Sequence, residues 1–163
     1  MDKVAFLPFG LMVDRYRWQL FDGTIPADQL NKGWNDLRLE YQGIVPPVER
    51  DESGFDAGAK YHIPGNVPYT RYFLARILQF QFFKAACDQA GWEGPLHRCS
   101  FYGNEEVGKN LDAMLEMGAS KPWPDALEAF TGERQMSGTA MVEYFAPLKA
   151  WLDEQNAGQT EGW

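Results

Sequence analysis

Apolar side chains recur every three to four residues along most of the chain, and this spacing predicts a mainly helical protein. We expect helices over residues 3–21, 26–42, 68–90, 104–118, 122–132 and from about 137 to 156. Gly23, Gly43 and Gly91 follow the first three segments and are typical helix stops. The third segment is apolar over much of its circumference, so we expect that helix to be buried. It carries Tyr69, Tyr72, Phe73, Ile77, Phe80, Phe83 and Cys87.

A long stretch of irregular sequence separates the second and third helices. It runs from Pro46 to about residue 66 and contains several glycines and prolines. We expect at most one short extended segment, near residues 57–63, in an otherwise all-α fold. A chain of 163 residues is long enough for one sizeable core. We therefore predict a single helical domain over residues 1–156, followed by a polar tail over 157–163.

Charge and hydropathy narrow the possible partners and locations. The formal net charge of -8 argues against nucleic acid as a partner, because an acidic surface repels phosphate. No apolar run approaches the roughly 18 residues that span a bilayer, so we expect no membrane span. The first residues lack the layout of a signal peptide. By itself this indicates a cytosolic protein or a chain that begins mid-protein.

The sequence contains no His-Glu-x-x-His zinc-binding motif. Its two histidines, His62 and His97, do not form a His-Glu-x-x-His pair, so we expect no metal site within the chain.

Residues 58–73 gather groups that could bind an anion. If residues 59–63 are extended, Lys60 and His62 point the same way, and Tyr69 and Tyr72 share one face of the following helix. Ammonium and phenol groups can hold a carboxylate, and imidazole or phenol donors can stabilise an oxyanion. The spacing alone favours the plainer alternative of ordinary tyrosines beside solvent-facing charges.

Several longer motifs resolve this ambiguity. They are residues 58–64 (Gly-Ala-Lys-Tyr-His-Ile-Pro), residues 67–73 (Val-Pro-Tyr-Thr-Arg-Tyr-Phe), 79–82, 2–9, 21–23, 37–43 and 121–124. Taken in order along the whole chain, they resemble the C-terminal part of the angiotensin-converting-enzyme family of zinc peptidyl-dipeptidases. The resemblance implies a C-terminal subdomain of a zincin-type peptidase, from a bacterial-type homologue or a fragment.

The family releases dipeptides from peptide C-termini and carries its zinc ligands and general-base glutamate N-terminal to the matched segment. The resemblance therefore implies that zinc and the N-terminal half of the catalytic domain are needed to complete the enzyme. It implies that this chain alone is inactive. A non-catalytic helical domain that binds peptides or proteins remains the alternative.

The resemblance also implies roles for individual residues. Lys60 and Tyr69 would hold the substrate's C-terminal carboxylate, and His62 would bind the peptide backbone near the scissile bond. Tyr72 would stabilise the oxyanion of the tetrahedral intermediate. The pocket for the last side chain of the substrate would be lined by Phe6 and Phe9.

Three further features follow from the family pattern. Arg71 would match one chloride ligand, and Trp34 with Arg38 would belong to a second chloride site; a plain cation–π pair is the alternative for these two. Cys87 and Cys99 match a family disulfide, which would place the parent protein in the periplasm or outside the cell; two buried thiols are the alternative.

Arg76 departs from the pattern. An aromatic residue of the last-side-chain pocket usually occupies this position, one helical turn after Tyr72. Arg76 is then either snorkelled or paired with a distant carboxylate of the protein, or it is available to the substrate. In the last case, peptides ending in Asp or Glu would be preferred.

Overall fold

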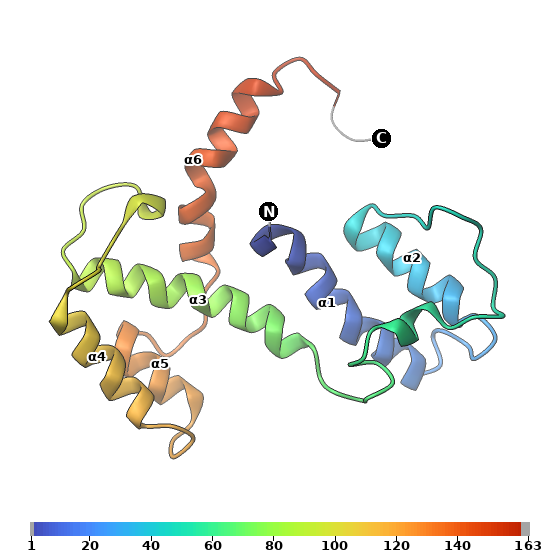
Figure 1. Cartoon of the computed structure of the whole chain (residues 1–163), viewed down its shortest axis with the longest axis horizontal. Coiled ribbons are helices and arrows are strands. Elements are labelled where there is room, and N and C mark those ends of the chain that lie inside the picture. The colour runs from blue at the N-terminus through green and yellow to red at the C-terminus, as the bar shows by residue number, and fades with distance from the viewer. Residues whose placement is uncertain (1, 161–163) are drawn as a thin grey trace. The chain divides into compact units, whose positions relative to one another are not determined.

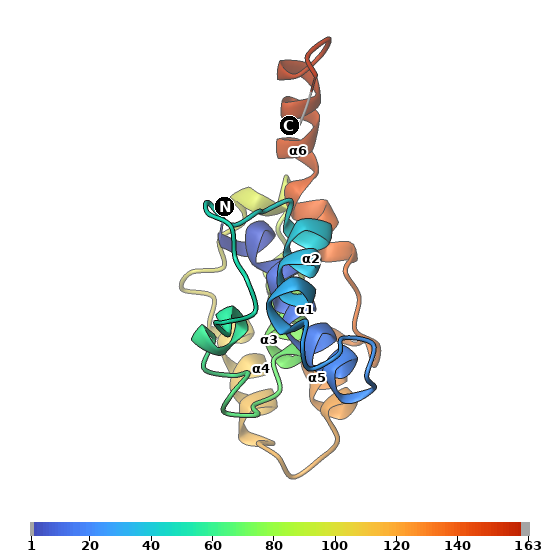
Figure 2. The same cartoon turned by 90° about the vertical axis from the view of Figure 1, so that its right-hand side faces the viewer.

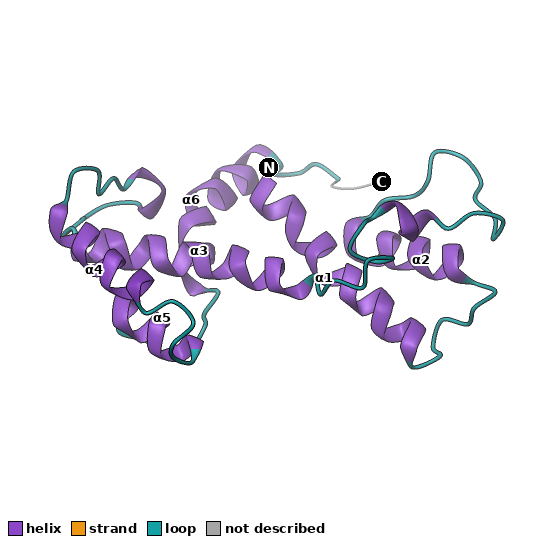
Figure 3. Cartoon of the chain, turned by 60° about the horizontal axis from the view of Figure 1, so that its bottom comes forward, coloured by secondary structure: helices purple, strands orange, loops and turns teal. Residues whose placement is uncertain are grey.

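The computed structural model describes residues 2–160, and within that range it contains helices, turns and loops but no strand (Figure 3). The all-α prediction is confirmed. The elements are α1 (Asp2–Phe21), α2 (Leu30–Gln42), η1 (Asp56–Ala59), α3 (Thr70–Gln89), η2 (Leu96–Arg98), α4 (Glu105–Glu116), α5 (Trp123–Thr131) and α6 (Thr139–Gln155). Among the described residues no helix is both long and apolar enough to cross a bilayer.

The chain divides into two compact units, Met1–Arg76 and Ile77–Trp163, with α3 contributing to each. In the first unit, α1 and α2 pack side by side (Figures 1 and 2). The core joins three buried residues of α1 to residues of α2 and of the connections before and after it. Its buried members are Met12, Val13, Tyr16, Ile25, Trp34, Leu37, Ala57, Ile63 and Tyr69.

Tyr16 is the largest fully buried side chain of this core. Its hydroxyl donates a hydrogen bond of 3.1 Å to the carbonyl of Leu30, which satisfies the phenol inside an apolar environment. Burial, reinforced by the negative charge of Glu52, raises the pKa of Tyr16 to about 12.

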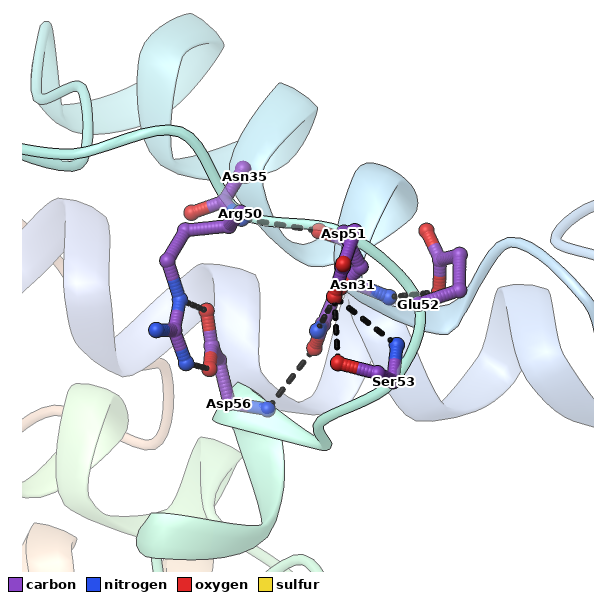
Figure 4. Close-up of polar contacts among 7 residues, drawn as sticks. All are labelled: Asn31, Asn35, Arg50, Asp51, Glu52, Ser53 and Asp56. Carbon is purple, nitrogen blue, oxygen red and sulfur yellow. Dashed lines mark hydrogen bonds and ion pairs between the residues drawn. The ribbon is translucent and has the colours of Figure 1, made fainter.

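The loop after α2 is fastened to the first turn of that helix (Figure 4). The Glu52 carboxylate accepts hydrogen bonds of 2.8 Å from the backbone N–H groups of Asn31 and Lys32. A carboxylate there satisfies free N–H groups and complements the helix dipole. The Asn31 side chain donates to the carbonyl of Asp51 and accepts from the N–H of Asp56, and Asp56 forms an ion pair with Arg50.

The one short extended segment that the sequence allowed, at 57–63, is not formed. The backbone instead forms a short 3₁₀ helix, η1, followed by turns through residue 66. Its N–H groups bond to carbonyls three residues back, as in Lys60 to Ala57 (3.1 Å) and Ile63 to Lys60 (2.8 Å). These local bonds satisfy the backbone without a partner strand.

The second unit is built from the rest of α3 and the helices that follow. Ala86, Val107 and Phe130 form its buried cluster. Asn104 caps α4, because its side-chain oxygen accepts from the N–H groups of Glu106 and Val107 at 3.1 Å. Cys87 and Cys99 are joined in a disulfide that ties the end of α3 to the segment after η2, so the predicted pairing is confirmed.

Burial of α3 on all sides is not observed. Only Phe80, Gln81, Ala86 and Cys87 of this helix are buried, whereas Tyr72 and Leu74 are exposed. Part of the apolar surface of α3 is therefore not covered by the described part of the chain. The assignment of residues 1–156 to a single domain stays a prediction. Residues 161–163 of the predicted tail lie outside the described residues.

Candidate functional site

The short connection between η1 and α3 brings together the side chains that the sequence singled out. Lys60 and His62 lie in the turns after η1, Tyr69 immediately precedes α3, and Tyr72 lies in its first turn. A tight turn, closed by a 2.9 Å hydrogen bond from Val67 N–H to the carbonyl of His62, folds the two parts back on each other.

Three rings of this connection are in mutual contact. The centroid of the His62 ring lies 4.8 Å from that of Tyr69 and 5.5 Å from that of Tyr72, and the two tyrosine rings are 5.0 Å apart. His62 Nε2 lies 3.4 Å from the Tyr72 hydroxyl. His62 Nδ1 is buried and has no hydrogen-bond partner among the described residues. Tyr72 is 42% exposed, so part of this residue is accessible from outside the cluster.

Lys60 also contacts this cluster. Its Nζ atom lies 4.7 Å from the centroid of the Tyr69 ring and 5.4 Å from that of Phe9. The sequence suggested that an extended segment would position Lys60. Residues 57–63 are not extended, and the turns after η1 instead place Lys60 beside these rings.

Phe6 and Phe9 complete the apolar side of the cluster. Their ring centroids lie 6.0 and 5.8 Å from that of Tyr69, respectively. These contacts are within the range of favourable aromatic pairs. The structure thus gathers Lys60, His62, Tyr69, Tyr72, Phe6 and Phe9 from three separate segments.

A buried ion pair, missed in the sequence, anchors this arrangement. Asp14 and Arg17, which are 3% and 6% exposed, form an ion pair on the inner face of α1. Asp14 Oδ2 accepts from the N–H groups of Tyr69 and Thr70 at 2.8 and 2.7 Å, and from the Thr70 hydroxyl at 2.8 Å. Arg17 Nη1 donates to the carbonyl of His62 at 2.9 Å.

Asp14 therefore caps the N-terminus of α3, while Arg17 holds the turn that carries His62. A signal existed in the sequence: two opposite charges, three residues apart, interrupt the apolar stripe that includes Val13 and Tyr16. Sequence alone does not say which backbone groups such a pair would reach.

The charge of Asp14 is maintained by its hydrogen bonds. Burial is the largest single influence and raises the pKa of this carboxyl group. The hydrogen bonds from Arg17, Thr70 and Tyr69 together outweigh it and hold the pKa of Asp14 below its ordinary value. The cap is thus ionised at neutral pH, as a carboxylate that complements the positive end of a helix should be.

Arg76 lies against the same aromatic cluster and is paired with a carboxylate distant in sequence. Its guanidinium lies 5.1 Å from the centroid of the Phe6 ring. Arg76 Nη2 lies 3.8 Å from Asp2 Oδ2. Distant pairing, one of the alternatives left open by the sequence, is therefore present.

Of the three residues predicted for chloride, Trp34 packs against the apolar side of this cluster. Trp34 is buried, and its ring packs edge-on against Phe9 and Tyr16. A cation–π pair of Arg38 with Trp34 is not found among the described residues; the Arg38 charge instead contributes to lowering the pKa of Asp56, after the larger effect of Arg50. Arg71 is exposed on α3.

The residues that the structure describes do not fit a zinc ion. No group of three or more His, Cys, Asp or Glu residues in the described part could hold a metal ion. Of the two histidines, His62 belongs to the aromatic cluster and His97 lies in η2, with its ring 6.3 Å from that of Tyr144.

Comparison with known proteins matches residues 1–163 to the family model described as Angiotensin-converting enzyme (Peptidase_M2). The chain is 50% identical over 165 residues to Angiotensin-converting enzyme of Mesocricetus auratus, covering 100% of this chain and 13% of that protein. It is 52% identical over 159 residues to Angiotensin-converting enzyme of Haematobia irritans exigua, covering 94% of this chain and 26% of that protein. The chain thus spans between about an eighth and a quarter of these relatives. Both are animal proteins, which gives the expected bacterial-type origin no support. The chain belongs to the angiotensin-converting enzyme family.

Proposed function

We propose that this chain forms the substrate-binding side of a zinc peptidyl-dipeptidase that releases dipeptides from peptide C-termini. The observation that carries the proposal is the convergence of Lys60, His62, Tyr69 and Tyr72 around one short connection. A cation, an imidazole and two phenols can recognise a peptide terminus and an oxyanion together.

Lys60 and Tyr69 hold the C-terminal carboxylate of the substrate in this proposal. The Lys60 ammonium already lies over the Tyr69 ring, and the described residues contain no ion pair to Lys60. A positive charge without a protein carboxylate is available to a ligand carboxylate, and the surrounding rings keep water away from one side of the pair. Phe6 and Phe9 line the space for the last side chain.

His62 and Tyr72 act nearer the bond that is cleaved. The buried Nδ1 of His62 lacks a partner within the described chain, which suits a contact with the substrate backbone or with the remainder of the enzyme. Tyr72 donates its hydroxyl proton in a hydrogen bond to the oxygen that becomes negatively charged in the tetrahedral intermediate. This donor is most useful in the transition state, where the charge is largest.

Zinc and the general base come from outside these 163 residues, because the sequence has no His-Glu-x-x-His pair. Zinc, when bound in the complete enzyme, supplies the activated water that attacks the peptide bond. The chain by itself is then inactive toward peptides. If Arg71, Trp34 and Arg38 bind chloride, they do so together with residues of the same missing part.

The partner of this chain is the N-terminal half of the catalytic domain. Large apolar side chains are exposed on both units, among them Val4, Tyr61, Tyr72 and Leu74 in the first unit and Trp123, Val142 and Trp151 in the second. Such a density of exposed apolar groups is characteristic of a surface that another polypeptide segment covers. A single helical domain over residues 1–156, with a tail over 157–163, is one part of that larger fold.

The complete protein works in an oxidising compartment outside the cell. The disulfide between Cys87 and Cys99 carries this proposal, because such bonds persist in secreted proteins and are rare in the cytosol. The alternative is a non-catalytic helical domain that binds peptides or proteins; it is kept because the described residues contain no group that could hold a metal ion. Finding an in-frame His-Glu-x-x-His pair in the coding sequence upstream of Met1 would decide in favour of the peptidase function.

Binding of matched peptides tests the proposed carboxylate site. We expect the chain to bind a short peptide with a free C-terminus more tightly than the same peptide as its C-terminal amide, measured by calorimetry or NMR titration. Lys60→Met should remove the difference, and Lys109→Met, an exposed lysine on α4, should preserve it. Equal binding of acid and amide by the unaltered chain would refute the proposed site.

A further inference from the structure

Two cations rest on one aromatic cluster in the first unit. The Lys60 ammonium lies over Tyr69 and Phe9, and the Arg76 guanidinium lies 5.1 Å from the centroid of the Phe6 ring. The rings of Phe6 and Tyr69 are themselves in contact, with centroids 6.0 Å apart. A planar guanidinium on a ring face keeps its N–H groups directed outward. Two of these groups can then donate to the two oxygens of one carboxylate.

A carboxylate already occupies the neighbourhood of Arg76. Asp2 Oδ2 lies 3.8 Å from Arg76 Nη2, at the outer limit of an ion pair, and only 3.0 Å from Lys3 Nζ. The Asp2 side chain is 70% exposed, whereas that of Arg76 is 30% exposed. Long, solvated pairs of this kind contribute little. The position of Asp2 therefore shows that a carboxylate fits beside Arg76. Because this ion pair is weak, another carboxylate can easily displace Asp2.

We infer that Arg76 selects substrates whose last residue is aspartate or glutamate. In this arrangement, Lys60 binds the main-chain carboxylate, Arg76 binds the side-chain carboxylate, and Phe6 supports the guanidinium. Asp2 acts as an internal competitor that holds Arg76 in place until a substrate arrives. The inference rests on the proposed carboxylate site and adds a substrate class to it.

Four peptides separate this inference from the proposal beneath it. They are acetyl-Ala-Ala-Pro-Glu, the same peptide ending in Gln, and the C-terminal amide of each. Comparing acid with amide tests the site at Lys60 and Tyr69. Comparing Glu with Gln, which are equal in shape and differ in charge, tests Arg76. Dissociation constants are measured on the whole chain, at low salt and at about 0.5 M salt, where screening shortens the range of exposed charges.

The unaltered chain should prefer the Glu peptide over the Gln peptide by about two- to five-fold at low salt, and by less at high salt. Asp2→Asn should enlarge this preference. Arg76→Gln should abolish it and Arg76→Lys should restore part of it, while Arg98→Gln, an exposed arginine of the second unit, should preserve it. Circular dichroism of each variant confirms that the helices are intact.

Equal affinity for the Glu and Gln peptides, with the acid still preferred over the amide, would overturn the role of Arg76 and leave the proposed function standing. A preference for Glu that survives Arg76→Gln would assign the selectivity to another cation and would equally overturn it. Loss of the acid-over-amide difference together with the Glu preference would sink both claims.

Discussion

Replacing Asp14 by asparagine tests the anchor that positions the proposed site. The carboxylate accepts from the backbone N–H groups of Tyr69 and Thr70, from the Thr70 hydroxyl and from Arg17. Asparagine has nearly the same shape but no charge. The substitution leaves the buried guanidinium of Arg17 without its charged partner and weakens the N-terminal cap of α3.

Removing one partner of a buried ion pair typically costs 3–5 kcal/mol. Asparagine keeps one acceptor oxygen for the helix N-terminus, so Asp14→Asn should lower the free energy of unfolding by about 3 kcal/mol at neutral pH. Asp36→Asn is the matched control, because Asp36 is exposed and paired with Lys32 on the surface of α2. It should change stability by less than about 0.5 kcal/mol.

The pH dependence provides a second measurement. Because its pKa is lower in the folded chain than in the unfolded chain, Asp14 stabilises the fold at neutral pH. This contribution is complete above the unfolded pKa of about 3.9 and is lost as the pH falls through the folded pKa. The stability of Asp14→Asn should therefore fall less steeply in acid than that of the unaltered chain or of Asp36→Asn.

Denaturant unfolding gives the free energies, and amide hydrogen exchange at Tyr69 and Thr70 reports the cap itself. Both amides should exchange faster in Asp14→Asn, and adding Arg17→Met should recover part of the lost stability by removing the stranded charge. A loss below about 1 kcal/mol, with unchanged exchange at these two amides, would show that the buried pair does not hold the connection.

Three other perturbations test the fold and the proposed chemistry. Reducing the disulfide, or replacing Cys99 by serine, should cost about 3 kcal/mol by the chain-entropy estimate; two alkylatable thiols in protein from an oxidising compartment would contradict the Cys87–Cys99 bond. In a complete enzyme containing this segment, Tyr72→Phe should lower the turnover number by about 10²–10³-fold with little change in substrate affinity; an unchanged turnover number would exclude the oxyanion role. Because the pKa of Tyr16 is raised to about 12, its neutral form stabilises the fold below the unfolded pKa of about 10, and this stability is lost as the pH rises toward 12. Tyr16→Phe should flatten that alkaline loss, and a titration with a phenol pKa near 10 at this position would refute the argument.

The helices and several of their ends could be predicted because the signals are local. Gly43 ends α2 with a φ of 64° and Gly132 ends α5 with a φ of 76°, a region of backbone space that glycine enters without steric cost. The side-chain cap of Asn104 on α4 is equally local. The period of apolar residues does not report burial, however, which is why α3 appeared buried all round from its sequence.

The turns at 57–63 and the role of Asp14 could not be predicted in the same way. Nothing in the alternation of residues 57–63 distinguishes an extended segment from consecutive turns. Asp14 bonds to backbone groups 55 and 56 residues away, and such a contact depends on how α1 packs against the loop. The sequence itself marked Lys60, His62, Tyr69 and Tyr72 as possible anion-binding groups, and the family resemblance implied their individual roles, whereas their convergence required the three-dimensional structure.

The most direct test of the account is peptidase activity of this chain in the presence of zinc, with and without a polypeptide that carries the zinc-binding half of the catalytic domain. Hippuryl-His-Leu, a blocked tripeptide with a free C-terminus, is a suitable substrate. The chain alone should neither bind zinc tightly at one-to-one stoichiometry nor hydrolyse the peptide, and activity should depend on both polypeptides and be reduced by Lys60→Met and Tyr72→Phe. Hydrolysis by the chain and zinc alone, or full activity of the other half without this chain, would contradict the account.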